Sequence, residues 1–279
     1  MPRWRSTTAR SPAAGGRSSA GRRVTASSLL RQLRLRPRAL AVLLALGATV
    51  AAARAGAQRG YFRPRVEENA DYDGQFTFVR LRYTGWSGRW IADYPAMERN
   101  FMTILNDLTT VHPRVGQSNI LSWDDPALSH YAVAYVCEPG FWQPTEDEAL
   151  ALRQWIQKGG FLIVDDFYNR QWLAFERGIK QVLPDGRIVP LDVSHPIFNS
   201  FFRIETLDGM THPDDAGAKA KYLGIYEDND PTKRLLVMIN YNNDIGDYME
   251  WSGQGVYAIN FSNDAYKLAT NYVVYGLTH

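Results

Sequence analysis

The chain contains a single cysteine, Cys137, among its 279 residues, so no disulfide can form within it. A fold without cross-links must be held by its hydrophobic core. The sequence also lacks the G-x-S-x-G motif that marks the nucleophile of an α/β hydrolase. It has no stripe of clustered Lys and Arg outside its first residues, and phosphate recognition needs such clustered cations. These absences argue against a disulfide scaffold, a serine hydrolase and a nucleic-acid partner.

Residues 1–57 contain no Asp, Glu or Lys, but they hold eleven Arg. The apolar run Ala39–Ala53 follows this basic stretch, and a small-x-small pattern ends at Ala57. This arrangement predicts a leader with a signal peptide, a hydrophobic region at 39–53 and cleavage near 57/58. An exported, periplasmic protein is the expected product. Fifteen apolar residues fall short of the ~20 that span a bilayer, so a membrane tether through an uncleaved signal anchor at 39–53 is the alternative.

Removal of the leader changes the charge of the protein. The formal charge of +2 for the whole chain, less eleven arginine charges, leaves about −9. An acidic mature protein again argues against nucleic acid. Residues 58–74 are polar and aperiodic, which predicts a linker or surface arm. Residues 75–279 are long enough and hydrophobic enough for one α/β domain.

The stretch from residue 131 to residue 166 gives the clearest prediction of local structure. Tyr131–Cys137 and Phe161–Val164 are apolar runs of strand length. Between them, Thr145 and Glu148 have the spacing of a helical capping box, and Gly159 suits the end of that helix. A strand, a helix and a strand in this order form a right-handed βαβ unit with parallel strands.

The same alternation continues along the chain and predicts a doubly wound, mostly parallel sheet with helices on both faces. The other predicted strands are Phe76–Tyr83, Tyr222–Tyr226, Leu235–Asn240 and Val256–Phe261, and the predicted helices follow Pro95 or cover Asn169–Leu183 and Asp264–Leu277.

Asp165 and Asp166 follow the second strand of the βαβ unit, at the carboxyl edge of the sheet, where α/β folds bind ligands. Two adjacent carboxylates there can bind a cation, orient a hydroxyl or act as a general base. In the alternative, Asp166 caps the next helix and Asp165 accepts backbone hydrogen bonds. Asp93 precedes the first helix and can approach the same edge, with Trp90 and Tyr94 as a stacking surface.

Asn240–Asp247 alternates Asn and Asp side chains, but glycine does not stand at the sixth position that an EF-hand calcium loop requires. We interpret this segment as a loop after a strand, with Asp244 and Glu250 as further candidates for the cleft. His112, His130, His212 and His279 lack zinc-ligand spacing, so no metal site is predicted, although a divalent cation at the carboxylates stays open.

Four segments carry a resemblance to a known family: YTG..RWIADYP, LRQWIQKGGFLIVDD, HPIF..FF and N.DIGDYMEW. Over Gln75 to His279 the chain resembles the bacterial family called domain of unknown function 4159. The resemblance implies a fold like the class I glutamine amidotransferases and ThuA-like flavodoxin-type proteins. It also implies envelope partners, among them a MoxR-type ATPase or a von Willebrand A-domain protein. No biochemical activity is established for the family.

Amidotransferases of that fold place a nucleophilic cysteine on a sharp turn from strand to helix. Here several residues separate Cys137 from the next helix, so a glutamine amidotransferase-like fold without a nucleophile elbow is expected, with Cys137 as a structural thiol rather than a nucleophile. In ThuA-like proteins a His-Pro loop lies near the carboxyl edge, which makes His195 a candidate acid, base or ligand. The alternative is that His195 only anchors its loop.

Three hypotheses for function follow. The first is a non-catalytic binding or partner-interaction module of the cell envelope, with a small polar ligand bound at Trp90, Asp93, Tyr94, Asp165, Asp166, His195 and Asp244. The second is a hydrolase or carbohydrate-modifying enzyme that uses Asp93, Asp166 and His195. The third is a structural subunit, which an exposed patch of Trp86, Trp90, Trp142 and Trp251 would favour.

Overall fold

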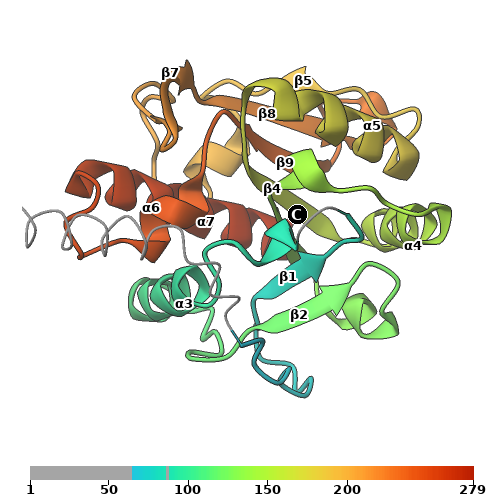
Figure 1. The fold of residues 1–279 in the computed structure, drawn as a ribbon, viewed down its shortest axis with the longest axis horizontal. Helices are drawn as coiled ribbons and strands as arrows, with labels where there is room; N and C mark the ends of the chain where they lie inside the picture. The colour runs from blue at the N-terminus through green and yellow to red at the C-terminus, as the bar shows by residue number, and fades with distance from the viewer. Residues whose placement is uncertain (1–64, 86–87) are drawn as a thin grey trace, which may run out of the picture. The chain divides into compact units, whose positions relative to one another are not determined.

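The computed structural model describes residues 65–85 and 88–279. The predicted leader, its signal peptide and the residue Trp86 lie outside these ranges. Within the described residues, seven strands form one mixed sheet in the order β2-β1-β3-β4-β9-β8-β5. A short hairpin, β6 and β7, forms a second sheet beyond it (Figure 1). The strands are β1 Val79–Arg82, β2 Asn119–Ser122, β3 Val133–Cys137, β4 Phe161–Phe167, β5 Val189–Pro190, β6 Thr211–His212, β7 Asp215–Lys219, β8 Lys221–Tyr226 and β9 Leu235–Tyr241.

Five strands of the large sheet run parallel. β2 and β3 flank β1, β4 follows β3, and β9 follows β4, all in the same direction. β8 and β5 complete the far side as antiparallel neighbours. The carboxyl ends of five strands therefore meet at one edge, which is where α/β folds present a ligand crevice.

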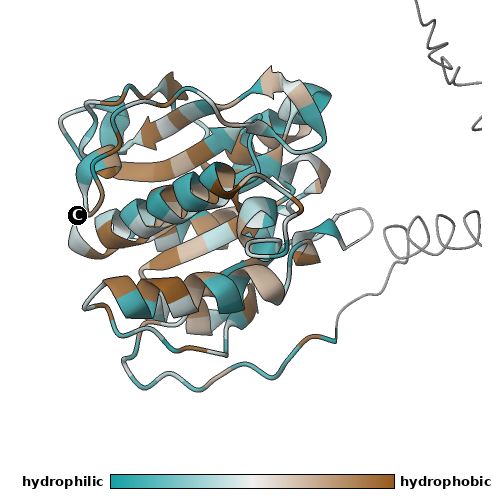
Figure 2. Ribbon diagram, turned by 90° about the vertical axis from the view of Figure 1, so that its left-hand side faces the viewer, coloured by the Kyte–Doolittle hydropathy of each residue, from teal (hydrophilic) through white to brown (hydrophobic). Residues whose placement is uncertain are grey.

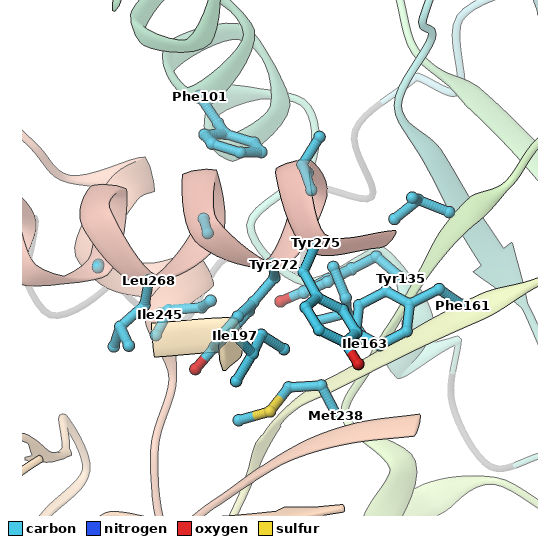
Figure 3. Close-up of a cluster of buried hydrophobic side chains, with 14 of the residues drawn as sticks. Phe101, Tyr135, Phe161, Ile163, Ile197, Met238, Ile245, Leu268, Tyr272 and Tyr275 are labelled. Atoms are coloured by element: carbon cyan, nitrogen blue, oxygen red, sulfur yellow. The ribbon is translucent and has the colours of Figure 1, made fainter. Parts of the chain in front are cut away.

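Helices cover both faces of the sheet, as the sequence predicted. α3 Ala96–Leu108, α6 Ile245–Glu250 and α7 Ile259–Thr278 pack on one face, and α4 Glu146–Gln157 and α5 Trp172–Val182 pack on the other. The helices carry hydrophobic segments beside hydrophilic ones (Figure 2), and their buried residues pack in the cores on the two faces of the sheet. Figure 3 shows the core on the α3, α6 and α7 face, to which Phe101 of α3, Tyr272 of α7 and Ile163 of β4 belong.

The chain crosses from β1 to β2 in one direction along the sheet and from β3 to β4 in the opposite direction. The connection from β1 through α3 to β2 covers one face, and the connection from β3 through α4 to β4 covers the other. The strand order therefore reverses between β1 and β3. A reversal of this kind opens a crevice outside the carboxyl ends of the two strands, because the chains that leave them diverge.

The predicted βαβ unit is present in detail. The Thr145 side chain accepts a hydrogen bond from the Glu148 backbone at 3.2 Å, and the Glu148 carboxylate accepts one from the Thr145 backbone at 2.8 Å. Gly159 has φ of 119°, a backbone conformation that glycine adopts without strain. β4 extends beyond the predicted end, through Asp165 and Asp166, and its register shifts between Val164 and Phe167.

One predicted element is wrong. Residues 256–258 form no strand, and the last helix begins at Ile259. Tyr257 and Phe261 alternate with smaller residues and so resemble a strand, but both rings pack on Tyr248. Tyr257 precedes the helix and Phe261 lies in its first turn, so both rings reach Tyr248 without any pairing in a sheet.

Residues 65–74, the part of the predicted arm that is described, run beside edge strand β2. The Asn69 side chain donates to the Ile120 carbonyl at 3.0 Å and accepts from the Ile120 backbone at 2.8 Å. Asn119 makes the equivalent pair of bonds with Ala70. These bonds satisfy backbone polar groups of β2 that an edge strand would otherwise leave unpaired. Among the described residues, no helix has the length and apolar character needed to cross a bilayer.

Candidate functional site

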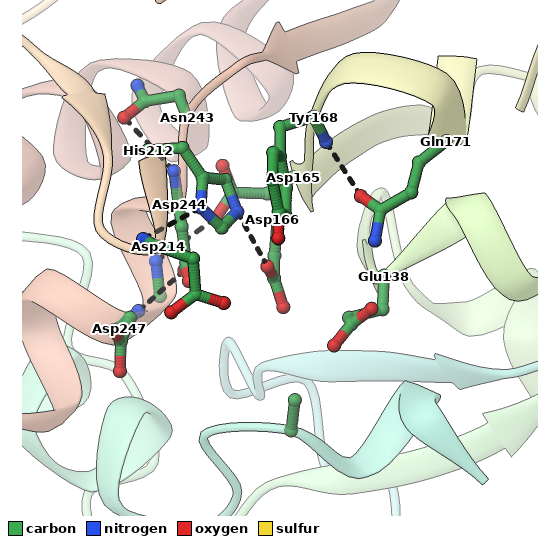
Figure 4. A network of polar contacts seen from close by, with 12 residues as sticks. Glu138, Asp165, Asp166, Tyr168, Gln171, His212, Asp214, Asn243, Asp244 and Asp247 are labelled. Carbon is green, nitrogen blue, oxygen red and sulfur yellow. Dashed lines mark hydrogen bonds and ion pairs between the residues drawn. The ribbon is translucent and has the colours of Figure 1, made fainter. Parts of the chain in front are cut away.

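Acidic side chains from four parts of the chain meet at the carboxyl edge of the sheet. Asp93 follows β1, Glu138 follows β3, Asp166 ends β4, and α6 with the turn before it follows β9. We call this cluster the acidic site and define it as Asp93, Cys137, Glu138, Asp166, His212, Asp244, Asp247 and Glu250. Figure 4 shows Glu138, Asp166 and Asp214 pointing toward a common space.

Asp166 lies at the centre of the acidic site. Its Oδ2 accepts from the Cys137 thiol, with Sγ at 3.2 Å, and its Oδ1 lies 3.3 Å from Nε2 of His212. Asp166 does not cap the following helix, because the Tyr168 backbone donates instead to the Gln171 side chain at 2.7 Å. Its φ of 61° falls in the left-handed region, which an aspartate occupies at a cost that the surroundings must offset.

The geometry around His212 fixes its tautomer. Nδ1 accepts a hydrogen bond from the Asp214 backbone at 3.2 Å, so in the neutral ring the proton sits on Nε2. That proton is donated to Asp166 Oδ1. The ring is 2% exposed and lies against Tyr168, with ring centroids 4.0 Å apart. His212 therefore orients the Asp166 carboxylate.

A buried arginine holds the segment that carries Asp93. Arg80 on β1 has no exposed surface and pairs with Glu98 at 2.5 Å. It also donates to the carbonyls of Trp90 and Ala92 at 3.1 and 2.8 Å. Asp93 follows directly, with φ of 64°. Arg80 therefore fixes the backbone from which the Asp93 carboxylate reaches the acidic site.

The turn after β9 brings the remaining carboxylates. Asp244 Oδ1 accepts from the Asp247 backbone at 2.7 Å and so begins α6. Asp247 and Glu250, three residues apart, share a face of that helix with their oxygens near Asp93. Gly246 has no room for a side chain, because a Cβ there would lie 2.5 Å from Asp93 Oδ2.

Asp165 lies beside the acidic site and is fully buried. Its Oδ2 accepts from the Tyr135 hydroxyl at 2.9 Å and from the Gly246 backbone at 3.0 Å, so it ties β4 to α6. Its Oδ1 has no hydrogen-bond partner among the described residues. Burial and the nearby Asp166 charge raise the pKa of Asp165 to about 6.

Glu138 occupies the turn directly after β3, with φ of 50°. Its Oε1 pairs with Arg89 at 2.7 Å, whereas its Oε2 is enclosed and has no hydrogen-bond partner within the described part of the chain. The residue is only 7% exposed. Burial, and next the charge of Asp166, raise the pKa of Glu138 to about 8.

The carboxylates of the acidic site repel one another. Burial raises the pKa values of Asp93 and Asp244 well above their usual range, and the Asp166 charge adds to both shifts. Burial and the Asp247 charge raise the pKa of Glu250 to about 7. Burial also raises the pKa of Asp247 and of the Cys137 thiol. Mutual repulsion of this kind is relieved by protons or by a bound cation.

Three groups of potential metal ligands occur among the described residues, each with its ligand atoms within 4.8 Å of one another. They are Asp93, Cys137 and Asp166; Asp166, His212 and Asp244; and Asp93, Asp247 and Glu250. Asp166 belongs to the first two groups and Asp93 to the first and third. The three groups are therefore overlapping parts of one site.

The structure brings Asp93, Asp165, Asp166 and Asp244 together but leaves His195 apart. His195 Nδ1 accepts from the Ile197 backbone at 3.2 Å, and its ring contacts Tyr226 and Tyr275. Tyr226 pairs with Leu235 at the start of β9, so His195 lies at the amino edge of the parallel strands. It anchors its loop, and a catalytic set of Asp93, Asp166 and His195 does not form.

The expected stacking surface is not assembled either. Tyr94 is buried, and its hydroxyl accepts from the Glu67 backbone at 3.1 Å. Trp90 is half-buried and packs on the core beside α4. Trp142 is buried, whereas Trp251 is 38% exposed, so these residues form no joint aromatic patch in the described part of the chain.

The fold and the site define an α/β domain with a mostly parallel sheet and a cluster of acidic side chains at its carboxyl edge. The chain belongs to the family called domain of unknown function (DUF4159), whose family model matches residues 77–277. No curated protein matches the chain.

Proposed function

We propose that this domain is a binding module that takes a cation or a cationic group at the acidic site. The observation that carries the proposal is the meeting of Asp93, Glu138, Asp166, Asp244 and Asp247 at one edge with raised pKa values for four of them. A positive ligand would remove the repulsion that keeps these groups protonated.

The two arginines nearest the acidic site, Arg80 and Arg89, already pair with other groups. Arg80 is committed to Glu98 and to two carbonyls, and Arg89 pairs with Glu138. Burial and the Asp166 charge still raise the pKa values of Asp244 and Asp247. The enclosed Glu138 Oε2 has no hydrogen-bond donor among the described residues, and a buried acceptor without a partner costs about 1–3 kcal/mol. A cation bound beside it would supply that interaction.

The proposal includes a setting in the cell envelope. The basic leader and the apolar run 39–53 support export to the periplasm, with a retained membrane anchor as the alternative. The parallel strand order β2-β1-β3-β4-β9 is that of flavodoxin-type folds, which supports a relation to the amidotransferase-like and ThuA-like proteins. By the family resemblance, a MoxR-type ATPase or a von Willebrand A-domain protein is the partner we propose.

The test is a thermal-shift screen of the full chain against divalent cations, amines and guanidines. A ligand at about 100 times its dissociation constant should add about 2.7 kcal/mol to the free energy of unfolding. The stabilisation should disappear in Asp166→Asn and persist in Asp107→Asn, an exposed carboxylate at the far end of α3. A screen in which no cation stabilises the folded protein would refute the proposal.

A hydrolase is the second candidate, and the pair of Asp166 with His212 is the observation that favours it. Asp166 accepts the Nε2 proton of His212, and Nδ1 of that ring already accepts from the Asp214 backbone, so the Asp166 carboxylate rather than the imidazole is the candidate general base. His212 holds that carboxylate in place. Substrate turnover that His212→Gln abolishes and His195→Gln retains would support this candidate.

A further inference from the structure

We infer that Asp93, Cys137 and Asp166 hold a divalent transition-metal ion of the zinc type, which rests on the cation-binding function proposed above. Cys137 ends β3, Asp166 lies near the end of β4, and Asp93 lies in the segment that joins β1 to α3, so the three side chains lie at the point where the strand order reverses. A cation there would be bound by two oxygens and one sulfur.

The spacing of the ligand atoms fits a tetrahedral ion. Zinc binds sulfur at about 2.3 Å and carboxylate oxygen at about 2.0–2.2 Å, which places the two ligand atoms about 3.5 Å apart at a tetrahedral angle. Cys137 Sγ lies 3.2 Å from Asp166 Oδ2 and 3.9 Å from Asp93 Oδ2. The two distances bracket the required value, and all three ligand atoms lie within 4.8 Å of one another.

An independent observation points to a ligand at this place. Glu138 Oε2 is enclosed, has no hydrogen-bond partner among the described residues, and belongs to a side chain that points toward Asp166 (Figure 4). Glu138 also follows Cys137 directly in the chain. A carboxylate oxygen of this kind can complete the coordination or accept a hydrogen bond from a metal-bound water.

The other two groups fit a zinc-type ion less well. A metal bound to His212 Nε2 would require the proton of the neutral ring to sit on Nδ1. That proton would then face the Asp214 backbone N–H, which now donates a hydrogen bond to Nδ1. His212 therefore serves as an outer residue that orients Asp166. Asp93, Asp247 and Glu250 offer oxygen alone, which suits the hard cations Mg²⁺ and Ca²⁺.

The thiol sets the chemistry of binding. As the metal–sulfur bond forms, the Cys137 S–H bond breaks and its proton leaves to solvent, so the ion binds thiolate and two carboxylates. Sulfur favours zinc and cobalt over magnesium and calcium. Cys137 is the only cysteine of the chain, and any signal from a metal–sulfur bond therefore reports on this site alone.

The test is the absorption spectrum of the metal-free full chain titrated with Co²⁺. We expect an ultraviolet sulfur-to-cobalt charge-transfer band together with the visible bands of tetrahedral cobalt, both removed when Zn²⁺ is added. Cys137→Ser should abolish the charge-transfer band and weaken Zn²⁺ binding at least tenfold, whereas Asp107→Asn should leave both unchanged.

The wild-type spectrum decides the inference even if a variant fails to fold. No charge-transfer band at saturating Co²⁺ would overturn it. If Mg²⁺, Ca²⁺ or an amine still stabilises the protein through Asp166, the cation-binding function stands and only the zinc-type site fails. If no cation stabilises it, both proposals fail.

Discussion

Charged side chains at the two edges of the parallel strands differ in their hydrogen bonds and in the direction of their pKa shifts. At the amino edge, Asp192 accepts from the Ser194 backbone and hydroxyl, and these bonds lower its pKa. His195 there caps a short turn. At the carboxyl edge, carboxylates face one another and their pKa values rise. Groups at the first edge serve the local fold, whereas the mutual repulsion of the groups at the second is the basis of the proposed cation site.

The largest expected effect comes from the buried arginine that supports the carboxyl edge. Arg80→Met leaves Glu98 charged and buried and frees the carbonyls of Trp90 and Ala92. Removal of one partner of a buried ion pair costs about 3–5 kcal/mol, which urea unfolding would measure. Arg82→Met, on the same strand but exposed, is the control and should change stability by less than about 0.5 kcal/mol. Equal losses in the two variants would contradict the supporting role.

A methyl group at Gly246 should disturb the acidic site itself. Its Cβ would stand 2.5 Å from Asp93 Oδ2 and 2.9 Å from the Tyr135 hydroxyl. Gly246→Ala should cost about 1–3 kcal/mol through overpacking and weaken cation binding by moving Asp93. Gly217→Ala, where the nearest atom is 3.2 Å away, is the matched control for stability and calorimetric titration. Unchanged cation affinity in Gly246→Ala would remove Asp93 from the ligand set.

The two edges should also differ in their response to pH. The folded-state pKa values of Glu138 and Glu250 are about 8 and about 7, above the usual 4.5, so the folded protein binds more protons than the unfolded chain between these values. Stability of the metal-free protein should therefore be greatest in acid and fall as pH rises from about 5 to about 8.

The free energy of unfolding should fall by at most about 1.4 kcal/mol per pH unit for each proton that the folded protein loses. Urea unfolding at several pH values in the presence of a chelator measures it. Glu138→Gln should flatten the profile, whereas Asp192→Asn should not, since the low pKa of Asp192 places its titration at acid pH. A stability that rises over this range would contradict the raised pKa values.

The smallest effect is expected at the amino edge. His195→Ala removes the cap of a short turn and should cost about 1 kcal/mol, the usual value for a lost helix cap. Cation affinity should stay within twofold of wild type, because His195 lies at the other edge. A larger loss of affinity, measured by calorimetric titration, would break the separation of the two edges.

The sequence alone predicted the fold class because its signals are local. The capping box at Thr145 and the apolar runs on either side of its helix define a parallel pair, and that pair places Asp165 and Asp166 at the carboxyl edge. Strand β2, only four residues long and flanked by loops, carried too short a pattern to recognise. The run 256–261 was misread because Tyr257, Ile259 and Phe261 alternate as in a strand, although Ile259 and Phe261 belong to the first turn of a helix.

The composition of the acidic site was harder to predict. His212 lies on a two-residue strand of a small hairpin, and nothing in the sequence indicates that this hairpin reaches the edge. Glu138 was read only as a residue that separates Cys137 from a helix. His195 was assigned to the wrong edge because the loop after β5 packs the His195 ring on Tyr226 and Tyr275 at the amino side. The course of a loop is set by such long-range packing, which local patterns do not carry.

Calorimetric titration of Zn²⁺ into the metal-free full chain, in two buffers of different protonation enthalpy, tests the central claim most directly. If the carboxyl edge is a cation site, binding saturates and releases at least one proton, because the thiol and the carboxyls must lose protons to bind. Asp166→Asn should abolish this binding and Asp107→Asn should retain it. Absence of Zn²⁺ binding in the wild type would contradict the zinc-type site, and binding that is unchanged in Asp166→Asn would contradict a cation site at the carboxyl edge.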